Sequence, residues 1–422
     1  MKYLVHLSRI IVGNLFIFSG LVKANDSLGF SYKLEDYFVA FGMNWDWLHQ
    51  ILVPMAAALC IVEIVVGVAV LVGWRMKEVS WSLLLMIIFF TILTGASAIF
   101  EIVRSCGCFG DAIPLTPWES FYKDLILIVF ILIIFLKKNM IKPAEDKKEV
   151  ISYFVISSII MIPLSIQLEW NAPLIFTVAI LAIALLVYFI KTKKAAGLAV
   201  IASLLVSIWF SYYAVEHLPF RDFRPYAIGK NLPEQMTLPE GAKSPVYENI
   251  LAYKNTVSGE VKEFTTAEYT ASKIWEDKSW EWLSTDSELI EAGDEAKITD
   301  LSILTHQDED ITDLVLSEDK VLWIVCYDLA LASTEHMNQL NQLVKEAKAE
   351  GVKVYGLSSA GTAQKDKFIQ DNNLDFDFLV TDGIVLKTMV RSNPGIMYLE
   401  HGTVKGKSHE NDISSLNELR NN

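Results

Sequence analysis

Cysteine is scarce in this sequence. Only four of the 422 residues are cysteine, and no two of them are spaced as Cys-x-x-Cys. Cys106 and Cys108 stand close together in the stretch RSCGCFGD, whereas Cys60 and Cys326 are isolated. Two thiols do not complete the tetrahedral shell that zinc requires, and no histidine lies near them in the sequence. We therefore expect no metal site.

Basic residues are outnumbered in the second half of the chain. Residues 1–215 carry a net charge of about +2 and residues 216–422 a net charge of about −16, which together give the overall −14. A phosphate backbone needs a basic face, and the acidic half would repel it. The charge distribution thus excludes nucleic acid as an expected partner.

Long apolar runs are confined to residues 1–215, and with 52% hydrophobic residues the chain is too apolar for one soluble domain. A membrane-spanning helix needs about 20 apolar residues. Seven runs are long enough, so we expect a polytopic α-helical membrane protein with about seven spans. The first run is counted as a span and not as a cleaved signal sequence, because no small-x-small cleavage site follows it. The predicted spans are Tyr3–Leu21, Leu52–Trp74, Trp81–Ile102, Phe121–Leu136, Val150–Ile166, Leu174–Ile190 and Ala196–Ala214.

The connections between the predicted spans differ in charge. Lysine and arginine gather before the first span and after the second, fourth and sixth spans. By the positive-inside rule these connections face the cytoplasm. We therefore expect an inner-membrane protein with a cytoplasmic N-terminus, whose RSCGCFGD loop and acidic C-terminal half are periplasmic. Thiols in that compartment can form disulfides.

One acidic residue, Glu63, lies in the middle of the second apolar run. A carboxylate inside the membrane is costly and is a functional hypothesis by default. The alternative is a protonated carboxyl that hydrogen-bonds Ser19, Asn14 or Thr94 of a neighbouring span. Cys60, in the outer half of the same run, is interpreted as a small apolar side chain.

The acidic half begins with an expected linker, residues 216–297, which contains a hairpin of Asn249–Lys254 and Glu260–Phe264. From Ile298 onward the pattern alternates between strand and helix, which is the order of an α/β thioredoxin-like domain over residues 298–422. Asn393 and Pro394 stand where such domains keep a cis proline. The predicted elements are strand Lys320–Tyr327, helix Thr334–Glu350, strand Val352–Leu357, helix Lys365–Asn372, strand Phe378–Val380, and a hairpin of Gly395–Glu400 and Thr403–Lys405.

The N-terminal sequence resembles a known family of membrane proteins. Residues 9–26, with Arg9, the stretch FIFSG, Lys23 and Asp26, resemble the DoxX superfamily, and the CGCFG loop resembles its MauE-like branch, from methylamine utilisation. The resemblance covers residues 1–140 and implies a four-span bundle, with residues 149–215 forming three additional spans. It also implies a role in maturing disulfide-rich periplasmic enzymes and similarity to membrane enzymes that pass electrons from thiols to quinone.

The companion of MauE proteins, MauD, is thioredoxin-like. Residues 298–422 therefore resemble a MauD- or TlpA-like partner fused to the same chain, as in envelope proteins of Bacteroidota. Membrane-anchored proteins of that kind place Cys-x-x-Cys directly after the first buried strand, where this sequence has Ala330 and Ser333. Neither residue can form a disulfide, and Cys326 is interpreted as a core residue. The groove beside Pro394 is expected still to bind extended client chains.

The pair Cys106 and Cys108 is then the remaining redox candidate. A Cys-x-Cys disulfide closes a short, strained ring, and strained disulfides exchange readily. Arg104 would favour the reactive thiolate. A static disulfide that caps two spans needs the same residues, and the resemblance favours exchange. Electrons would then leave through Cys60 to a quinone or pass to a separate soluble partner, and no cofactor is certain.

Two functional hypotheses follow. In the first, the protein is a thiol-disulfide oxidoreductase-like maturation factor that acts on periplasmic or membrane client proteins. In the second, it is a non-enzymatic membrane scaffold that displays an acidic domain to the subunits of an envelope complex. The loop dithiol favours the first hypothesis, and the missing Cys-x-x-Cys at Ala330 and Ser333 favours the second.

Overall fold

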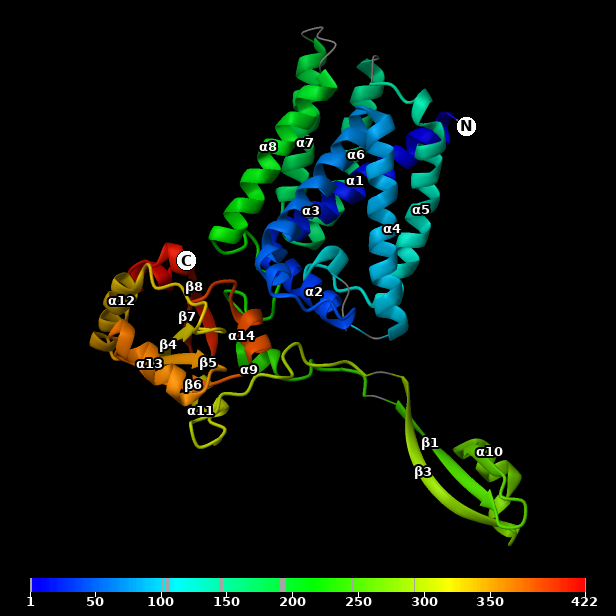
Figure 1. Ribbon diagram of the computed structural model, residues 1–422, viewed down its shortest axis with the longest axis vertical. Coiled ribbons are helices and arrows are strands. Elements are labelled where there is room, and N and C mark those ends of the chain that lie inside the picture. Colours follow the sequence, from blue (N-terminus) through cyan, green and yellow to red (C-terminus); the bar gives the residue numbers. More distant parts are fainter. Residues whose placement is uncertain are drawn as a thin grey trace.

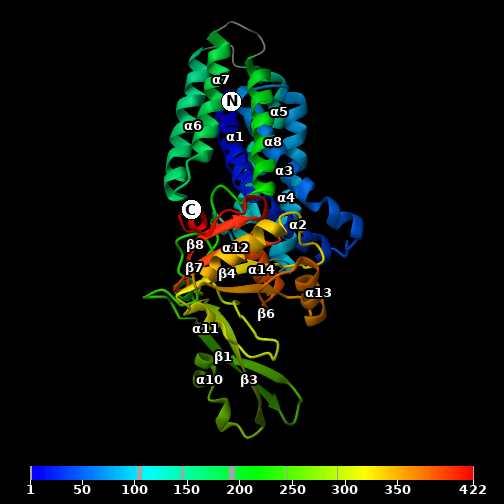
Figure 2. The ribbon, with the colours of Figure 1, turned by 90° about the vertical axis from the view of Figure 1, so that its left-hand side faces the viewer.

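A computed structural model describes residues 2–100, 102, 107–143, 147–189, 195–244, 246–291 and 293–421. The first half of the chain forms a helical bundle, and the second half forms an α/β domain and a separate three-stranded arm (Figures 1 and 2). The α/β domain lies at one end of the bundle, and the arm projects away from both (Figure 1).

In the described part of residues 2–216, seven long helices build the bundle. Helix α1 is its most enclosed member, since 78% of its apolar window is buried, compared with 28% for α6. Glycine lets α1 approach α3 closely: a Cβ added at Gly20 would lie 2.6 Å from Cγ1 of Ile64. The helices are α1 (Lys2–Asn25), α3 (Asp46–Val72), α4 (Met76–Phe100), α5 (Pro117–Lys137), α6 (Lys147–Gln167), α7 (Ala172–Phe189) and α8 (Ala195–Glu216).

Among the described residues, five helices are long and apolar enough to cross a membrane: α1, α3, α4, α6 and α8. The described apolar part of α7 is shorter, Ala172–Leu186. Helix α5 has 21 residues but carries Glu119, Lys123 and Asp124 in its first turns. The bundle confirms a polytopic helical membrane protein, and the number of seven spans stays a prediction.

Between the first two predicted spans the chain forms α2 (Ser27–Ala40). This helix lies across the end of the bundle that faces the α/β domain (Figures 1 and 2). Asp26 caps this helix, because its carboxylate accepts a hydrogen bond of 2.8 Å from the Gly29 N–H. The short 3-10 turn η1 (Gly107–Phe109) connects α4 to α5.

The C-terminal domain is an α/β sheet with strand order β6-β5-β4-β7-β8. Strands β4, β5 and β6 are parallel, and β7 runs antiparallel to β4. The Asn393–Pro394 peptide bond is cis, as the sequence predicts. Helix α14 was not predicted. The elements are β4 (Lys320–Val325), α12 (Met337–Ala349), β5 (Lys353–Ser358), α13 (Thr362–Asn372), β6 (Phe378–Val380), α14 (Gly383–Met389), β7 (Gly395–Glu400), β8 (Thr403–His409) and α15 (Leu416–Arg420).

The start of the expected linker belongs to this domain. Tyr226 and Leu232 are buried in the core on one side of the sheet. The Gly229 N–H donates to the Val404 carbonyl at 2.8 Å, which fastens the segment along β8. The sequence predicted a linker from residue 216 onward, but the few apolar side chains at the start of that linker pack onto the sheet.

The arm contains the predicted hairpin as β1 (Val246–Asn255) and β2 (Val261–Thr265). A third strand, β3 (Trp280–Glu291), pairs with β1, so the sheet order is β2-β1-β3. The predicted hairpin thus has a third strand, formed by part of the expected linker. The root of the arm is closed, because the Asp294 N–H donates to the Lys243 carbonyl at 2.9 Å.

Candidate functional site

The cysteine loop connects α4 to α5 at the end of the bundle that faces the α/β domain. Cys106 and Arg104 lie outside the described residues, and Cys108 is described in its backbone alone, as part of η1. The next residue, Phe109, is buried, and its ring centroid lies 5.5 Å from that of Phe18 in α1. The loop is therefore anchored in the bundle directly after Cys108.

Two lysines that the sequence analysis did not single out surround this loop. Lys33 of α2 lies against Gly107, the residue between the two cysteines, since a Cβ added there would be 2.9 Å from Cδ of Lys33. Lys123 of α5 lies on the other side, with its Nζ 5.5 Å from the ring centroid of Phe109. The loop thus meets positive charge from two helices.

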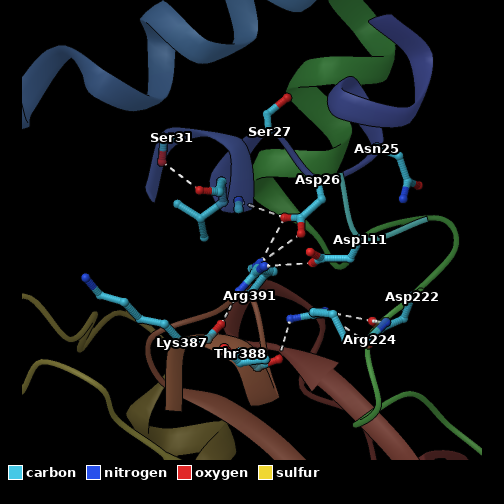
Figure 3. A network of polar contacts seen from close by, with 12 residues as sticks. Asn25, Asp26, Ser27, Ser31, Asp111, Asp222, Arg224, Lys387, Thr388 and Arg391 are labelled. Atoms are coloured by element: carbon cyan, nitrogen blue, oxygen red, sulfur yellow. Dashed lines mark hydrogen bonds and ion pairs between the residues drawn. The ribbon is translucent and has the colours of Figure 1, made fainter. Parts of the chain in front are cut away.

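Arg391 of the α/β domain contacts the bundle beside the loop (Figure 3). Its Nε lies 2.9 Å and 3.0 Å from the two carboxylate oxygens of Asp26, and a terminal nitrogen lies 3.6 Å from Oδ2 of Asp111. Its other terminal nitrogen donates to the Lys387 carbonyl. Burial alone would raise the pKa of Asp26, but the charges of Arg391 and Arg224 and the hydrogen bonds from Arg391 and the Gly29 N–H hold it below its ordinary value.

A second ion cluster lies next to this contact. Arg224 belongs to the segment that follows α8, residues 217–225, called the exit segment here. Its Nε lies 2.7 Å from Oδ1 of Asp222, and a terminal nitrogen donates to the Thr388 carbonyl at 2.9 Å (Figure 3). Lys407 of β8 contacts the other oxygen of Asp222 at 2.7 Å. Burial lowers the pKa of Lys407 to about 8, against the attraction of Asp222. The exit segment is thereby fixed to the α/β domain beside Arg391.

The predicted dithiol positions lie in the turn after β4. Ala330 is exposed, and Ser333 donates its N–H to the Asn393 carbonyl at 2.9 Å. The Asn393 side chain in turn donates to the Asp328 carbonyl at 2.7 Å. The structure thus brings Ser333 beside the cis peptide bond of Pro394, which is itself buried.

Cys326, at the end of β4, is fully buried. Burial raises the pKa of its thiol, so that the reactive thiolate does not form there. The core interpretation of Cys326 agrees with this environment.

The turn after β4, which contacts Asn393, faces the bundle. Tyr32 of α2 meets the ring of Tyr327 edge-on, with the centroids 6.4 Å apart, and the Lys387 ammonium lies 4.7 Å from the centroid of Tyr32. Tyr327 directly follows Cys326. The face that was expected to bind client chains therefore contacts α2 of the same chain.

Glu63 has a partner that the sequence analysis did not consider. Its Oε2 lies 2.5 Å from Nζ of Lys23 in α1, and the two side chains are 5% and 2% exposed. Two of the partners expected for Glu63 make hydrogen bonds to other groups. The Thr94 hydroxyl donates to the Asp124 carboxylate, and the Asn14 side-chain amide donates to the Ile10 carbonyl.

Cys60 lies close to this buried pair. It is one turn before Glu63 in α3 and is fully buried. Its carbonyl oxygen faces Gly20 of α1, 3.1 Å from an added Cβ. A direct exchange between Cys60 and the loop would require this buried residue to become accessible.

Two crevices reach the cysteine loop at Gly107, and Lys23, Phe30 and Lys33 line both of them. The first crevice opens between α2 and the segment that contains Arg221 and Arg224, and the charged residues Asp26, Asp111 and Arg224 are part of its lining. The second is mostly apolar and lies between α2 and α4, with Phe90, Leu93 and Thr94 in its wall. Within the described ranges, no group of three or more His, Cys, Asp or Glu side chains could hold a metal ion.

Comparison with known proteins supports the division into two parts. Residues 1–137 match the family described as Methylamine utilisation protein MauE. The protein named Protein TlpB from Flavobacterium psychrophilum is 25% identical over 143 residues, which cover 32% of this chain and 37% of that protein. This chain therefore spans little more than a third of the length of that relative. No solved structure matches.

The broader DoxX resemblance stays a prediction. The N-terminal bundle is similar to MauE proteins, and in this chain it is joined to an α/β domain with the succession of strands and helices and the cis proline that were expected of a thioredoxin-like domain.

Proposed function

We propose that this protein acts in envelope protein maturation and exchanges disulfides with client proteins through Cys106 and Cys108. The observation that carries the proposal is the position of Arg391. It contacts Asp26 and Asp111, and Asp111 follows Cys108 by three residues. Arg391 also precedes Asn393 and the cis proline by two and three residues. Through Asp111, this contact connects the cysteine loop to the chain segment that carries the cis proline.

The proposed exchange has two steps. A client thiolate attacks one sulfur of a Cys106–Cys108 disulfide, which forms a mixed disulfide and releases the other loop thiolate. A second client thiolate then attacks the mixed disulfide, so that the client gains a disulfide and both loop thiols are reduced. The client has lost two electrons, which the loop now carries, and its two protons have passed to the loop thiols or to water.

The loop must pass these electrons on before the next exchange. A lipid-soluble quinone would accept two electrons and two protons, and a soluble disulfide partner would serve the same purpose. Phe30, Phe90 and Lys23 line a narrow apolar crevice between α2 and α4, but the crevice is too small for the ring of a quinone unless the two helices separate. A soluble disulfide partner needs no such crevice.

In this proposal the thioredoxin-like domain positions the loop and its client. Its own dithiol is replaced by Ala330 and Ser333, and Tyr32 contacts the residue next to its former active site. A client chain that enters the groove beside Pro394 must displace α2 from Tyr327. We place the bundle in the inner membrane, with the N-terminus in the cytoplasm and the domain in the periplasm, where disulfides persist.

The test is to trap the mixed disulfide. Cys106→Ser and Cys108→Ser, each in the full chain in its native membrane, leave one loop thiol, whose thiolate attacks a client disulfide in the reverse of the second step, and remove the thiol that would resolve the resulting mixed disulfide. We expect one of the two variants to accumulate mixed disulfides after acid quenching and alkylation, visible by electrophoresis without reductant. Cys326→Ala is the matched control, since that thiol is buried. If neither single variant traps a client, the exchange function is wrong.

A non-enzymatic scaffold remains the second candidate, and the arm favours it. The β2-β1-β3 sheet projects away from the rest of the molecule (Figure 1) and exposes Tyr247, Val257 and Trp282. Replacing residues 245–292 by two glycines would remove the arm at its closed root. A scaffold would then lose its stoichiometric complex in a membrane co-purification, whereas an exchange protein would still trap mixed disulfides at the loop.

A further inference from the structure

The arm has one long free edge, formed by β3. One side of β3 pairs with β1, and among the described residues no strand pairs with its other side. Helix α10 (Thr266–Ser272) lies beside β1, away from that free side (Figures 1 and 2). An edge strand directs the N–H and C=O groups of every second residue away from its partner, where they can pair with another extended chain. With 12 residues, β3 is a longer edge than β2, which has five.

Pairing with β1 keeps part of this edge regular. From Ser284 to Leu289 the strand lies opposite Ala252 to Tyr247 without a shift in register. The register shifts between Ala252 and Tyr253, which leaves Leu283 as the extra residue of a bulge. Because the inner side of residues 284–289 is already hydrogen-bonded, their backbone is ordered before a partner arrives. An incoming chain therefore meets a preformed edge, and only the incoming chain has to be ordered.

Large apolar side chains are exposed next to the regular segment. Trp282 is 60% exposed and Leu283 is 52% exposed. The Trp282 Nε1 donates to Oγ1 of Thr285 at 2.9 Å, which orients the indole ring. The neighbouring Trp280 already accepts a cation, because the Lys262 ammonium lies 5.0 Å from its ring centroid. Trp282 thus presents a second indole ring of the same strand, which a cation from outside the molecule can reach.

The charge of the arm restricts what can pair with β3. Residues 246–291 contain ten acidic and four basic residues, and β3 itself contains four acidic residues and no basic residue. Glu281 and Asp286 are both exposed. Like charges that lie opposite one another destabilise paired strands, whereas opposite charges stabilise them. Two copies of β3 would therefore repel each other, and a strand that carries lysine or arginine would be attracted.

We propose that the free edge of β3 binds an extended, basic segment of a partner protein as a fourth strand of the arm. Backbone hydrogen bonds along residues 284–289 supply affinity. Lysine or arginine side chains beside Glu281, Asp286 and the ring of Trp282 supply selectivity. This inference goes beyond disulfide exchange, because binding at the edge needs no cysteine.

The test is amide hydrogen exchange of the full-length protein in nanodiscs of phosphatidylcholine. The probe is a synthetic ten-residue peptide that alternates lysine with threonine. We expect the amides of residues 281–287 to exchange more slowly as the peptide is added, while the amides of β2 keep their rate. The same peptide with N-methyl groups on alternate residues keeps its charge but cannot donate hydrogen bonds along the edge. It should leave the exchange of β3 unchanged.

Matched variants separate the β3 edge from the general acidity of the arm. The pair Glu281→Gln and Asp286→Asn neutralises β3 and should raise the peptide concentration that half-slows exchange by about fivefold. The pair Glu260→Gln and Glu263→Gln removes two exposed charges at the opposite edge and should change that concentration by less than about twofold. Unchanged exchange of β1 without peptide verifies that both variants keep the sheet.

Several results would overturn the inference. If the N-methylated peptide slowed β3 as well as its parent does, or if both variant pairs weakened binding equally, charge alone would explain the attraction. Slower exchange of β3 at higher protein concentration, without peptide, would assign the edge to a second copy of the chain. No slowing by the lysine peptide would leave the edge without its proposed occupant. Because the probe has no thiol, none of these results bears on the trapping of clients in the Cys106→Ser and Cys108→Ser variants.

Discussion

Arg391 and Asp26 form an ion pair across 365 positions of the sequence, with Nε of Arg391 2.9 Å from Oδ1 of Asp26. The pair joins the α/β domain to the end of α1, where α2 begins. The Asn25 side chain supports the same junction, because it donates to the Arg221 carbonyl at 2.7 Å. Through Asp111 the junction extends to the cysteine loop, so one guanidinium contacts the bundle and the loop at the same time.

Replacing Arg391 by methionine should release the domain from the bundle. The arginine side chain is 7% exposed, and removing one partner of a buried ion pair costs about 3–5 kcal/mol because the other charge stays behind. We expect faster amide hydrogen exchange in α2 and in residues 219–224. Arg420→Met, which breaks the Arg420–Glu350 pair inside the domain, is the control. Unchanged exchange in α2 would show that Arg391 does not hold the junction.

The junction should tolerate mild acid. The pKa of Asp26 is lower in the folded protein than in an unfolded chain, so its contribution is fully present above the ordinary aspartate pKa of about 4 and is lost as the pH falls below that value. The protection factors of the α2 amides, which are relative to the intrinsic exchange rate at each pH, should therefore stay high from pH 7 to about pH 4 and fall below it. Asp26→Asn should show the rapid exchange already at pH 7. A transition near pH 6 would point to histidine instead.

His409 should make the α/β domain sensitive to a higher pH range. Its Nδ1 accepts the Asn411 N–H at 3.2 Å, which requires a neutral ring, and burial lowers its pKa to about 4. The unfolded chain binds this proton near pH 6.5, so stability falls as the pH drops from about 6.5 to about 4, by an estimated ~1–2 kcal/mol. His409→Asn keeps an acceptor without titrating. Thermal unfolding of both proteins across this range should give a flatter curve for the variant, and parallel curves would contradict the assignment.

The buried pair of Lys23 and Glu63 should behave as one unit. Replacing either residue alone by methionine leaves an uncompensated charge in the bundle and should cost about 3–5 kcal/mol. The double variant leaves no charge and should be more stable than either single variant. Thermal unfolding in one detergent compares the three proteins. Losses that simply add in the double variant would show that the two side chains are independent.

Local patterns in the sequence were sufficient for much of the α/β domain. Strands β4 and β7 are apolar runs bounded by turns, and the observed bounds lie within two residues of the predicted ones. Strand β3 was missed because Trp280–Glu291 mixes acidic residues with tryptophan and pairs with β1 from a distance. A strand of this kind is defined by its partner and not by its own composition.

In the candidate site, too, local sequence features were predicted and contacts between distant elements were not. The cysteine pair and the cis proline were found from spacing and position alone. The contacts around them, Arg391 with Asp26 and Lys33 with Gly107, join elements that are remote in sequence. Charge patterns indicate which residues carry charge, but the partner of each charge follows from tertiary packing. This is also why Glu63 was assigned polar neighbours in place of Lys23.

The most direct measurement is the oxidation state of Cys106 and Cys108 in native membranes, before and after brief treatment with a mild reductant. Differential alkylation with two mass-tagged reagents gives the fraction of each form. An exchanging pair predicts a mixture of disulfide and thiol that shifts readily, because a Cys-x-Cys ring is strained. A fully oxidised pair that resists the reductant would be a static clip and would contradict the proposed function.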